Sequence, residues 1–313
     1  MIFIYFGKNI IGMNWNTLGN EIKQGDIKSL ARAITGVEND LEGYFEFLKT
    51  LEINRNIPII GITGPPGAGK STLVNALLGT FSKEGKRVGV IAIDPTSPFH
   101  YGSLLGDRIR MVEHFTNPNI FIRSLATRGS LGGLSAKTIE ITDVMRAFPF
   151  DVLLVETVGV GQSEVEIVGL ADTTILVLVP EAGDEIQGIK SGVMEIADVF
   201  VVNKADRDGA EVFVSNIKKM LHERTASEHE PQVVKTIASQ QEGINELMDA
   251  IKNCNNQKTS TKKDLLIAEK AYRLIQTEKM KNINKKELIE AISKENIKSD
   301  FNLYQFIEKY FGR

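Results

Sequence analysis

A glycine-rich segment, Gly64–Ser71, has the residue types and the spacing that hold phosphate groups. Its sequence GPPGAGKS has glycine at the first and sixth positions, followed at the end by lysine and serine. Glycine lets backbone N–H groups turn inward around an anion, and the positive end of a following helix adds to the attraction. The spacing predicts a phosphate loop in which Lys70 reaches the β- and γ-phosphates and the Ser71 hydroxyl binds Mg²⁺.

A second polar group, Asn203-Lys204-Ala205-Asp206, directly follows the apolar run 199–202. In this NKxD arrangement the Asp206 carboxylate can accept from both N1–H and the N2 amine of guanine, a donor pair that adenine lacks. The stem of Lys204 can lie over the base, and Asn203 would tie this loop to the phosphate loop. Strand-to-helix turns favour Asn and Asp anyway, so the position of the tetrapeptide after a phosphate loop supports the assignment. Ala238, within TIAS at the end of the next expected strand, is placed to close over the base.

The predicted nucleotide contacts are Gly64, Pro65, Pro66, Gly67, Ala68, Gly69, Lys70, Ser71 and Thr72 around the phosphates, and Asn203, Lys204, Asp206 and Ala238 around the base.

Acidic residues at the ends of other apolar runs predict the rest of a magnesium site. Glu156 ends the run 152–155, with Gly159 three residues later, and this resembles the DxxG element of GTPases. Asp94 ends another run, and Asp107 lies thirteen residues further on. Carboxylates at the carboxyl ends of parallel strands converge on the ligand crevice, and Mg²⁺ needs one or two of them. Each acid could instead cap a helix or lie in a loop.

The position after Gly159 holds Val160, where Ras-like GTPases have a water-orienting glutamine. Gln162 comes two residues later. We therefore expect slow hydrolysis by the isolated protein, unless another segment or a partner supplies the missing group.

Short β-branched apolar runs that alternate with helix-like stretches must position these residues. Such runs predict strands buried on both faces of a parallel sheet, joined by right-handed crossovers. The expected fold is α/β, a doubly wound, mostly parallel sheet of the P-loop NTPase type. Six strands are expected, at Ile57–Ile62, Val88–Ile93, Val152–Val155, Thr174–Val179, Val199–Val202 and Val233–Ile237.

The spacing of apolar residues differs on both sides of this core. Residues 14–56 carry apolar residues at helical spacing and predict two or three amphipathic helices before a GTPase domain at 57–252. Residues 253–313 predict a linker, starting with a stretch at 253–263 that has no apolar periodicity, and then a helical arm. Residues 1–13 predict a tail, either disordered or the product of an early start codon with Met13 as the true start.

Composition adds only broad limits. The net charge of −3 favours neither nucleic acid nor an anionic membrane as a partner, and we expect neither. The single cysteine, Cys254, rules out an internal disulfide, and no apolar run approaches the length of a membrane span. A reducing, cytoplasmic location is expected.

Longer stretches of the chain resemble one family, the MeaB/ArgK GTPases. The resemblance runs from about residue 19 to 251 and is carried by GPPGAGKST, IDPTSPFHYGSLLGDRIRM, IRSLATRGSLGGLSAKT, ETVGVGQSE, EAGDEIQGIKSGVMEIADVFVVNKAD and EGINEL. It implies a fold similar to the nickel-insertion and signal-recognition GTPases (the SIMIBI class), with helical extensions at both ends. It also implies a homodimer that guards cofactor delivery to an adenosylcobalamin-dependent acyl-CoA mutase, chiefly methylmalonyl-CoA mutase, and helps to rescue that enzyme.

The same resemblance implies roles for charged residues. Asp94, Asp107 and Glu156 match positions associated with Mg²⁺ and the switches. Arg110 and Lys190 match charged switch positions that become important when the mutase binds, and Gln187 lies in the same segment as Lys190. The sequence departs from the family pattern at 99–101 and 125–126, in expected loops that could contact the partner rather than the nucleotide.

Three other functions remain open at this point. An older family label suggests a kinase of a basic amino-acid transport system, although NKAD argues against ATP. A nickel metallochaperone would need clusters of Cys and His, and this chain has four scattered His and one Cys. A scaffolding switch whose hydrolysis matters little is the third.

Overall fold

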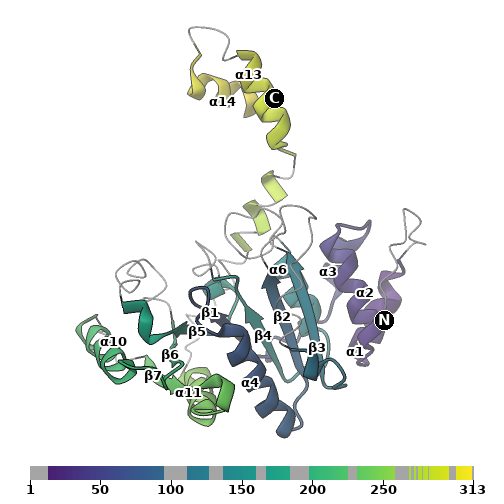
Figure 1. Cartoon of the computed structure of the whole chain (residues 1–313). Coiled ribbons are helices and arrows are strands. Elements are labelled where there is room, and N and C mark those ends of the chain that lie inside the picture. Colours follow the sequence, from purple (N-terminus) through teal and green to yellow (C-terminus); the bar gives the residue numbers. More distant parts are fainter. Residues whose placement is uncertain are drawn as a thin grey trace. The chain divides into compact units, whose positions relative to one another are not determined.

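The structure is a computed structural model of the 313-residue chain (Figure 1). It describes residues 13–94, 111–126, 137–159, 167–183, 197–224, 231–257, 268, 271–272, 274–276, 278–280, 282–295 and 301–311. The chain divides into two compact units, Met1–Leu266 and Ile267–Arg313.

The first unit is built on a seven-stranded sheet in the order β3-β2-β4-β1-β5-β6-β7, in which every neighbouring pair is parallel. The doubly wound α/β prediction is confirmed. The strands are β1 Ile59–Thr63, β2 Val88–Asp94, β3 Ile120–Ala126, β4 Val152–Glu156, β5 Thr173–Leu178, β6 Val199–Asn203 and β7 Gln232–Thr236.

Strand β3 corrects the prediction of six strands. It lies at the edge of the sheet beside β2, and Arg123 and Ser124 interrupt its apolar character. An edge strand has one neighbour instead of two, so it can hold polar residues that a central strand cannot. Consequently Asn203 ends the sixth strand in the chain, not the fifth, and Glu156 ends the fourth, not the third.

Helices cover both faces of the sheet because alternate strand residues point to opposite sides (Figure 1). Helices α4 (Lys70–Lys83) and α11 (Ile244–Gln257) pack on one face, against residues such as Ile62 and Val177. The other face is covered by α10 (Ala210–Arg224) over β5 and β6, and by α6 (Thr138–Arg146) with the N-terminal helices over β1, β2 and β4.

The N-terminal extension forms three helices: α1 Trp15–Lys23, α2 Ile27–Glu38 and α3 Tyr44–Thr50. Asp26 caps α2 by accepting from the backbone N–H groups of Lys28 and Ser29. With the Ser29 hydroxyl as the largest contribution, these bonds lower the pKa of the Asp26 carboxyl. Apolar residues such as Ile34 are fully buried in the same cluster as strand residues, so these helices belong to the core of the first unit.

Two cations tie this extension to the rest of the unit. Arg123 on β3 pairs with Glu38 at the end of α2. The Lys137 amine, just before α6, lies 2.7 Å from Asp40 Oδ1 and 4.4 Å from the centre of the Tyr44 ring. Burial alone would lower the pKa of Lys137, but its hydrogen bonds and charge partners, Asp40 first among them, raise that pKa above its usual value.

The second unit holds α13 (Lys285–Glu295) and α14 (Leu303–Phe311), and the described residues of 268–280 are also helical. The buried ring of Phe306 lies between Phe301 and Tyr310, and Lys309 pairs with Glu295 at 2.8 Å. At the end of the first unit, α11 runs on to Gln257, so residues 253–257 are helical where a linker was expected. Within the described residues no helix is both long and apolar enough to cross a membrane.

Candidate functional site

The Gly64–Ser71 loop leaves the carboxyl end of β1 and leads directly into α4. Gly64 has φ +140°, and a Cβ at this position would lie 2.1 Å from the carbonyl oxygen of Val177 on β5. A side chain would therefore collide with a neighbouring central strand. The loop can turn over the sheet only because residue 64 is glycine.

Lys70 and Gly159 meet at this loop. The buried Lys70 amine donates to the carbonyl oxygens of Gly64, at 2.9 Å, and Pro65, at 3.1 Å. Gly159 has φ +86°, and a Cβ there would lie 2.4 Å from Lys70 Nζ and 2.5 Å from the Gly64 oxygen. The glycine three residues after Glu156 thus lies directly against the phosphate loop, as a contact to the same phosphate group would require.

Ser71 and Glu156 form a second close pair. The Ser71 hydroxyl donates to Glu156 Oε1 at 2.7 Å, and both side chains are buried. Glu156 is the last residue of β4 and stands opposite Ile62 on β1, which places its carboxylate beside the first turn of α4. A hydroxyl and a carboxylate together are oxygen donors of the kind that Mg²⁺ takes alongside nucleotide phosphates, so these two residues fit that ion.

Asn203 holds the base-side loop to the phosphate loop. Its Nδ2 donates to the Ala68 carbonyl oxygen at 2.9 Å, which confirms the predicted tie. Its Oδ1 accepts from Thr236 Oγ1 at 3.1 Å and from the Ala238 N–H at 3.2 Å. One buried amide therefore joins the phosphate loop, β7 and the turn that contains Ala238.

Lys204 and Asp206 follow Asn203 in the loop after β6. The Lys204 amine donates to the Gly67 carbonyl oxygen at 2.8 Å, and its backbone is left-handed with φ +57°. Asp206 is exposed beyond the end of β6. The structure thus brings Asn203, Lys204 and Ala238 to the phosphate loop and leaves the Asp206 carboxylate open to solvent.

Two further contacts near the site have no signal in the sequence. Arg207, directly after Asp206, pairs with Glu181 in the short helix η3 (Pro180–Gly183) that follows β5. Arg207 is the main reason why the pKa of the Glu181 carboxyl is lowered. Thr157, next to Glu156, bonds to Thr63 at the end of β1. A lone arginine or threonine carries no spacing signal, so only the fold reveals these partners.

Several predicted residues lie wholly or partly outside the described part of the chain. Asp94 ends β2 opposite Ala126, but its side chain lies outside the description. Asp107, Arg110 and Lys190 also lie outside the described residues, as do Val160, Gln162 and Gln187.

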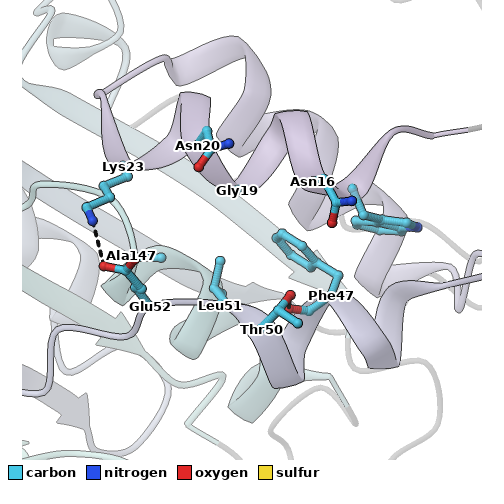
Figure 2. A pocket seen from close by; sticks show the side chains of 10 residues that line it. Asn16, Gly19, Asn20, Lys23, Phe47, Thr50, Leu51, Glu52 and Ala147 are labelled. Atoms are coloured by element: carbon cyan, nitrogen blue, oxygen red, sulfur yellow. Dashed lines mark hydrogen bonds and ion pairs between the residues drawn. The ribbon is translucent and has the colours of Figure 1, made fainter.

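A separate hollow of about 270 Å³ lies among the N-terminal helices (Figure 2). Its walls combine aromatic residues of α1 and α3 with polar side chains, and Lys23 and Glu52 pair across one end at 2.6 Å. None of the predicted site residues lines it.

Comparison with known proteins decides the family. The model of the family described as methylmalonyl-CoA mutase-associated GTPase MeaB matches residues 30–296. The chain belongs to the MeaB family. It is therefore a GTPase, and the family model extends over the GTPase core, most of α2, all of α3 and part of the second unit.

Individual relatives agree with this membership. A candidate GTPase of Pyrococcus abyssi is 53% identical over 236 residues, covering 74% of this chain and 73% of the relative. The GTPase ArgK of Escherichia coli is 39% identical over 241 residues, covering 74% of this chain and 72% of the relative. A mouse protein, methylmalonic aciduria type A homolog, mitochondrial, is 40% identical over 206 residues, covering 63% of this chain and 49% of that protein.

Among solved structures, one described as a LAO/AO transport system kinase is similar in fold. It is 24% identical, with a TM-score of 0.68 over 97% of this chain and 100% of that chain.

Proposed function

We propose that this MeaB-family GTPase is the chaperone of an adenosylcobalamin-dependent acyl-CoA mutase. The observation that carries the proposal is the match of a mutase-associated GTPase family over residues 30–296. The name of the mouse relative, which refers to methylmalonic aciduria, agrees with methylmalonyl-CoA mutase as the client. GTP binding and hydrolysis would gate cofactor loading and protect or reactivate the mutase.

The site residues receive roles that follow from their contacts. Lys70 and the backbone of Gly64–Ser71 would hold the phosphates, and Gly159 would respond to the γ-phosphate beside them. Ser71 and Glu156 would hold Mg²⁺, Glu156 through water. When bound, the ion neutralises charge that develops on the phosphate oxygens.

Base recognition falls to the loop that Asn203 anchors. Asp206 would accept the two guanine donors, and the stem of Lys204 would cover the ring. Asn203 and Ala238 would line the base-binding loop. The bonds of Asn203 to Ala68 and to Ala238 hold this loop against the phosphate loop.

Basal turnover is proposed to be slow and to rise when the mutase binds. Val160 occupies the position of the water-orienting glutamine, so one catalytic group is missing. A cation brought to the γ-phosphate on partner binding could supply the deficit, and Arg110 and Lys190 are the candidates within this chain.

We further propose that the protein is a cytoplasmic homodimer that uses the second unit as its contact. Large apolar side chains of that unit are exposed, as a small helical arm that packs on another subunit would require. They include Tyr272, Ile275, Met280, Ile289, Leu303, Tyr304 and Ile307.

The proposal is tested by nucleotide-dependent binding. The purified chain is mixed with purified adenosylcobalamin-dependent mutase from the same genome, with a non-hydrolysable GTP analogue, with GDP or without nucleotide. A complex detected by gel filtration and calorimetry, with an affinity that depends on the nucleotide, supports the proposal. Absence of a complex in all three states contradicts it.

A further inference from the structure

Two buried hydroxyl groups lie between the phosphate loop and the segment that carries Glu156 and Gly159. Thr63 is the last residue of β1 and Thr157 follows the last residue of β4. Both are at least 98% buried, and Thr157 Oγ1 donates to Thr63 Oγ1 at 2.9 Å. We call these two groups the hydroxyl pair.

The hydroxyl pair lies where two loops of the site separate. Strands β1 and β4 are paired up to Ile62 and Glu156, and the Thr157 N–H extends the ladder by donating to the Ile62 oxygen at 3.0 Å. One residue beyond Thr63 the phosphate loop begins, and two residues beyond Thr157 comes Gly159. The hydroxyl pair is therefore the last side-chain bond between the strands before the loops diverge.

Beyond the hydroxyl pair, the 156–159 segment packs closely against the phosphate loop. Gly159 lies so close to the phosphate loop that a Cβ on it would be 2.4 Å from Lys70 Nζ. Glu156, one residue before Thr157, accepts from Ser71 at 2.7 Å. A shift of the 156–159 segment relative to β1 would change both contacts at once.

We propose that Thr157, through its bond to Thr63, is a positioning residue for GTP hydrolysis. It sets the separation of the two loops and thereby the placement of Glu156 and Gly159 against Ser71 and Lys70. This inference rests on the roles proposed above for those four residues. Misplacement by about 1 Å can cost roughly 10²-fold in rate, so a single buried bond at this point can matter for turnover.

A positioning role and a purely structural role predict different results for Thr157→Val. This change removes the hydroxyl at constant shape, and we expect kcat for GTP to fall about tenfold while the KM for GTP and the Kd for GDP stay within about threefold. Thr157→Ser, which keeps the hydroxyl, should stay within about twofold of wild-type kcat. Thr63→Val should resemble Thr157→Val, because either change breaks the same bond.

The double variant Thr63→Val, Thr157→Val separates a loss of turnover from a loss of folding stability. A lone buried hydroxyl destabilises the fold, whereas replacing both partners by apolar groups of the same shape is nearly neutral. We expect the double variant to regain thermal stability but to keep the low kcat of the single variants. Thr142→Val is the matched control, because it removes another buried hydroxyl, which bonds to the Thr138 oxygen within α6. It should leave kcat unchanged.

Turnover is measured without partner, at a temperature where every variant is folded. A kcat within twofold of wild type in both Thr157→Val and the double variant overturns the inference, and so does an equal loss in Thr157→Ser and Thr157→Val. Because basal turnover does not involve the mutase, failure of the chaperone proposal leaves this test intact.

Discussion

Asn203 Nδ2 donates to the Ala68 carbonyl oxygen at 2.9 Å, so the loop after β6 is joined directly to the phosphate loop after β1. The bond spans 135 positions of the chain and is buried. The base-side loop and the phosphate loop of the proposed nucleotide site are thereby held together by the protein's own hydrogen bond.

Asn203→Asp should weaken GDP and GTP alike. The change replaces the donor to Ala68 with a carboxylate that faces a carbonyl oxygen, while it keeps an acceptor for Ala238. Loss of this bond releases the base-side loop from the phosphate loop, and the new carboxylate adds negative charge near the bound phosphates, so both affinities should fall roughly tenfold or more in calorimetry. Asn56→Asp, the same change at an exposed position, is the control. Unaltered affinity in Asn203→Asp would remove the bond from the binding framework.

Asp206→Asn should affect the choice of base. The amide can donate toward guanine N1–H instead of accepting from it, so GTP binding should weaken by at least about 1–3 kcal/mol, with a relative gain for XDP. Calorimetry with GDP, GTP, XDP and ATP measures both effects. Asp208→Asn, an equally exposed neighbour, should change nothing. If the wild-type protein binds ATP as tightly as GTP, the base-reading role of Asn203–Asp206 is wrong.

These two residues also show what the sequence could predict. The phosphate loop, the NKAD tetrapeptide and the buried central strands have local signals, because apolar runs and fixed spacing need no tertiary information. Strand β3 has no such signal, since its Arg123 pairs with Glu38 on a helix far away in sequence, a contact that no local pattern indicates. A linker was also expected from residue 253, because apolar periodicity stops there, yet residues 253–257 continue helix α11.

Glu156→Ala should impair hydrolysis more than binding. The carboxylate lies 2.7 Å from the Ser71 hydroxyl, where the pair is proposed to hold Mg²⁺. We expect kcat at saturating Mg²⁺ to fall on the order of 10²-fold while GDP still binds, because the lost group acts on charge that develops during the reaction. Phosphate release over a Mg²⁺ titration is the measurement, and Glu84→Ala, an exposed site at the end of α4, is the control. A normal kcat in Glu156→Ala would take this residue out of the site.

Asp172→Ala should destabilise the first unit. Asp172 Oδ2 accepts from Arg146 at 2.6 Å and from the Ile59 N–H at 2.8 Å, and the Arg146 side chain is only 4% exposed. Arg146 would keep its bonds to the Ile57 oxygen but lose its carboxylate partner, which is itself 27% exposed, so the expected cost is about 2–3 kcal/mol. Urea unfolding should show this loss, whereas Glu52→Gln, which breaks the exposed pair with Lys23, should change stability by no more than about 1 kcal/mol. Equal effects of the two changes would contradict the structural role of Asp172.

Steady-state GTP hydrolysis with and without the mutase tests whether this protein serves a cobalamin-dependent mutase. Four proteins are assayed alone and with the genome's own adenosylcobalamin-dependent acyl-CoA mutase: wild type, Arg110→Ala, Lys190→Ala and Arg55→Ala. Arg55 is an exposed site before β1, and its variant is the control. A supplied cation can raise turnover by about 10³–10⁵ in other GTPases, so stimulation of at least tenfold is expected here.

We expect stimulation in wild type and in Arg55→Ala, and its loss in Arg110→Ala or Lys190→Ala, with basal rate and nucleotide affinity unchanged. Wild-type turnover that no cobalamin-dependent mutase alters would contradict the chaperone function and leave a GTPase with a different client.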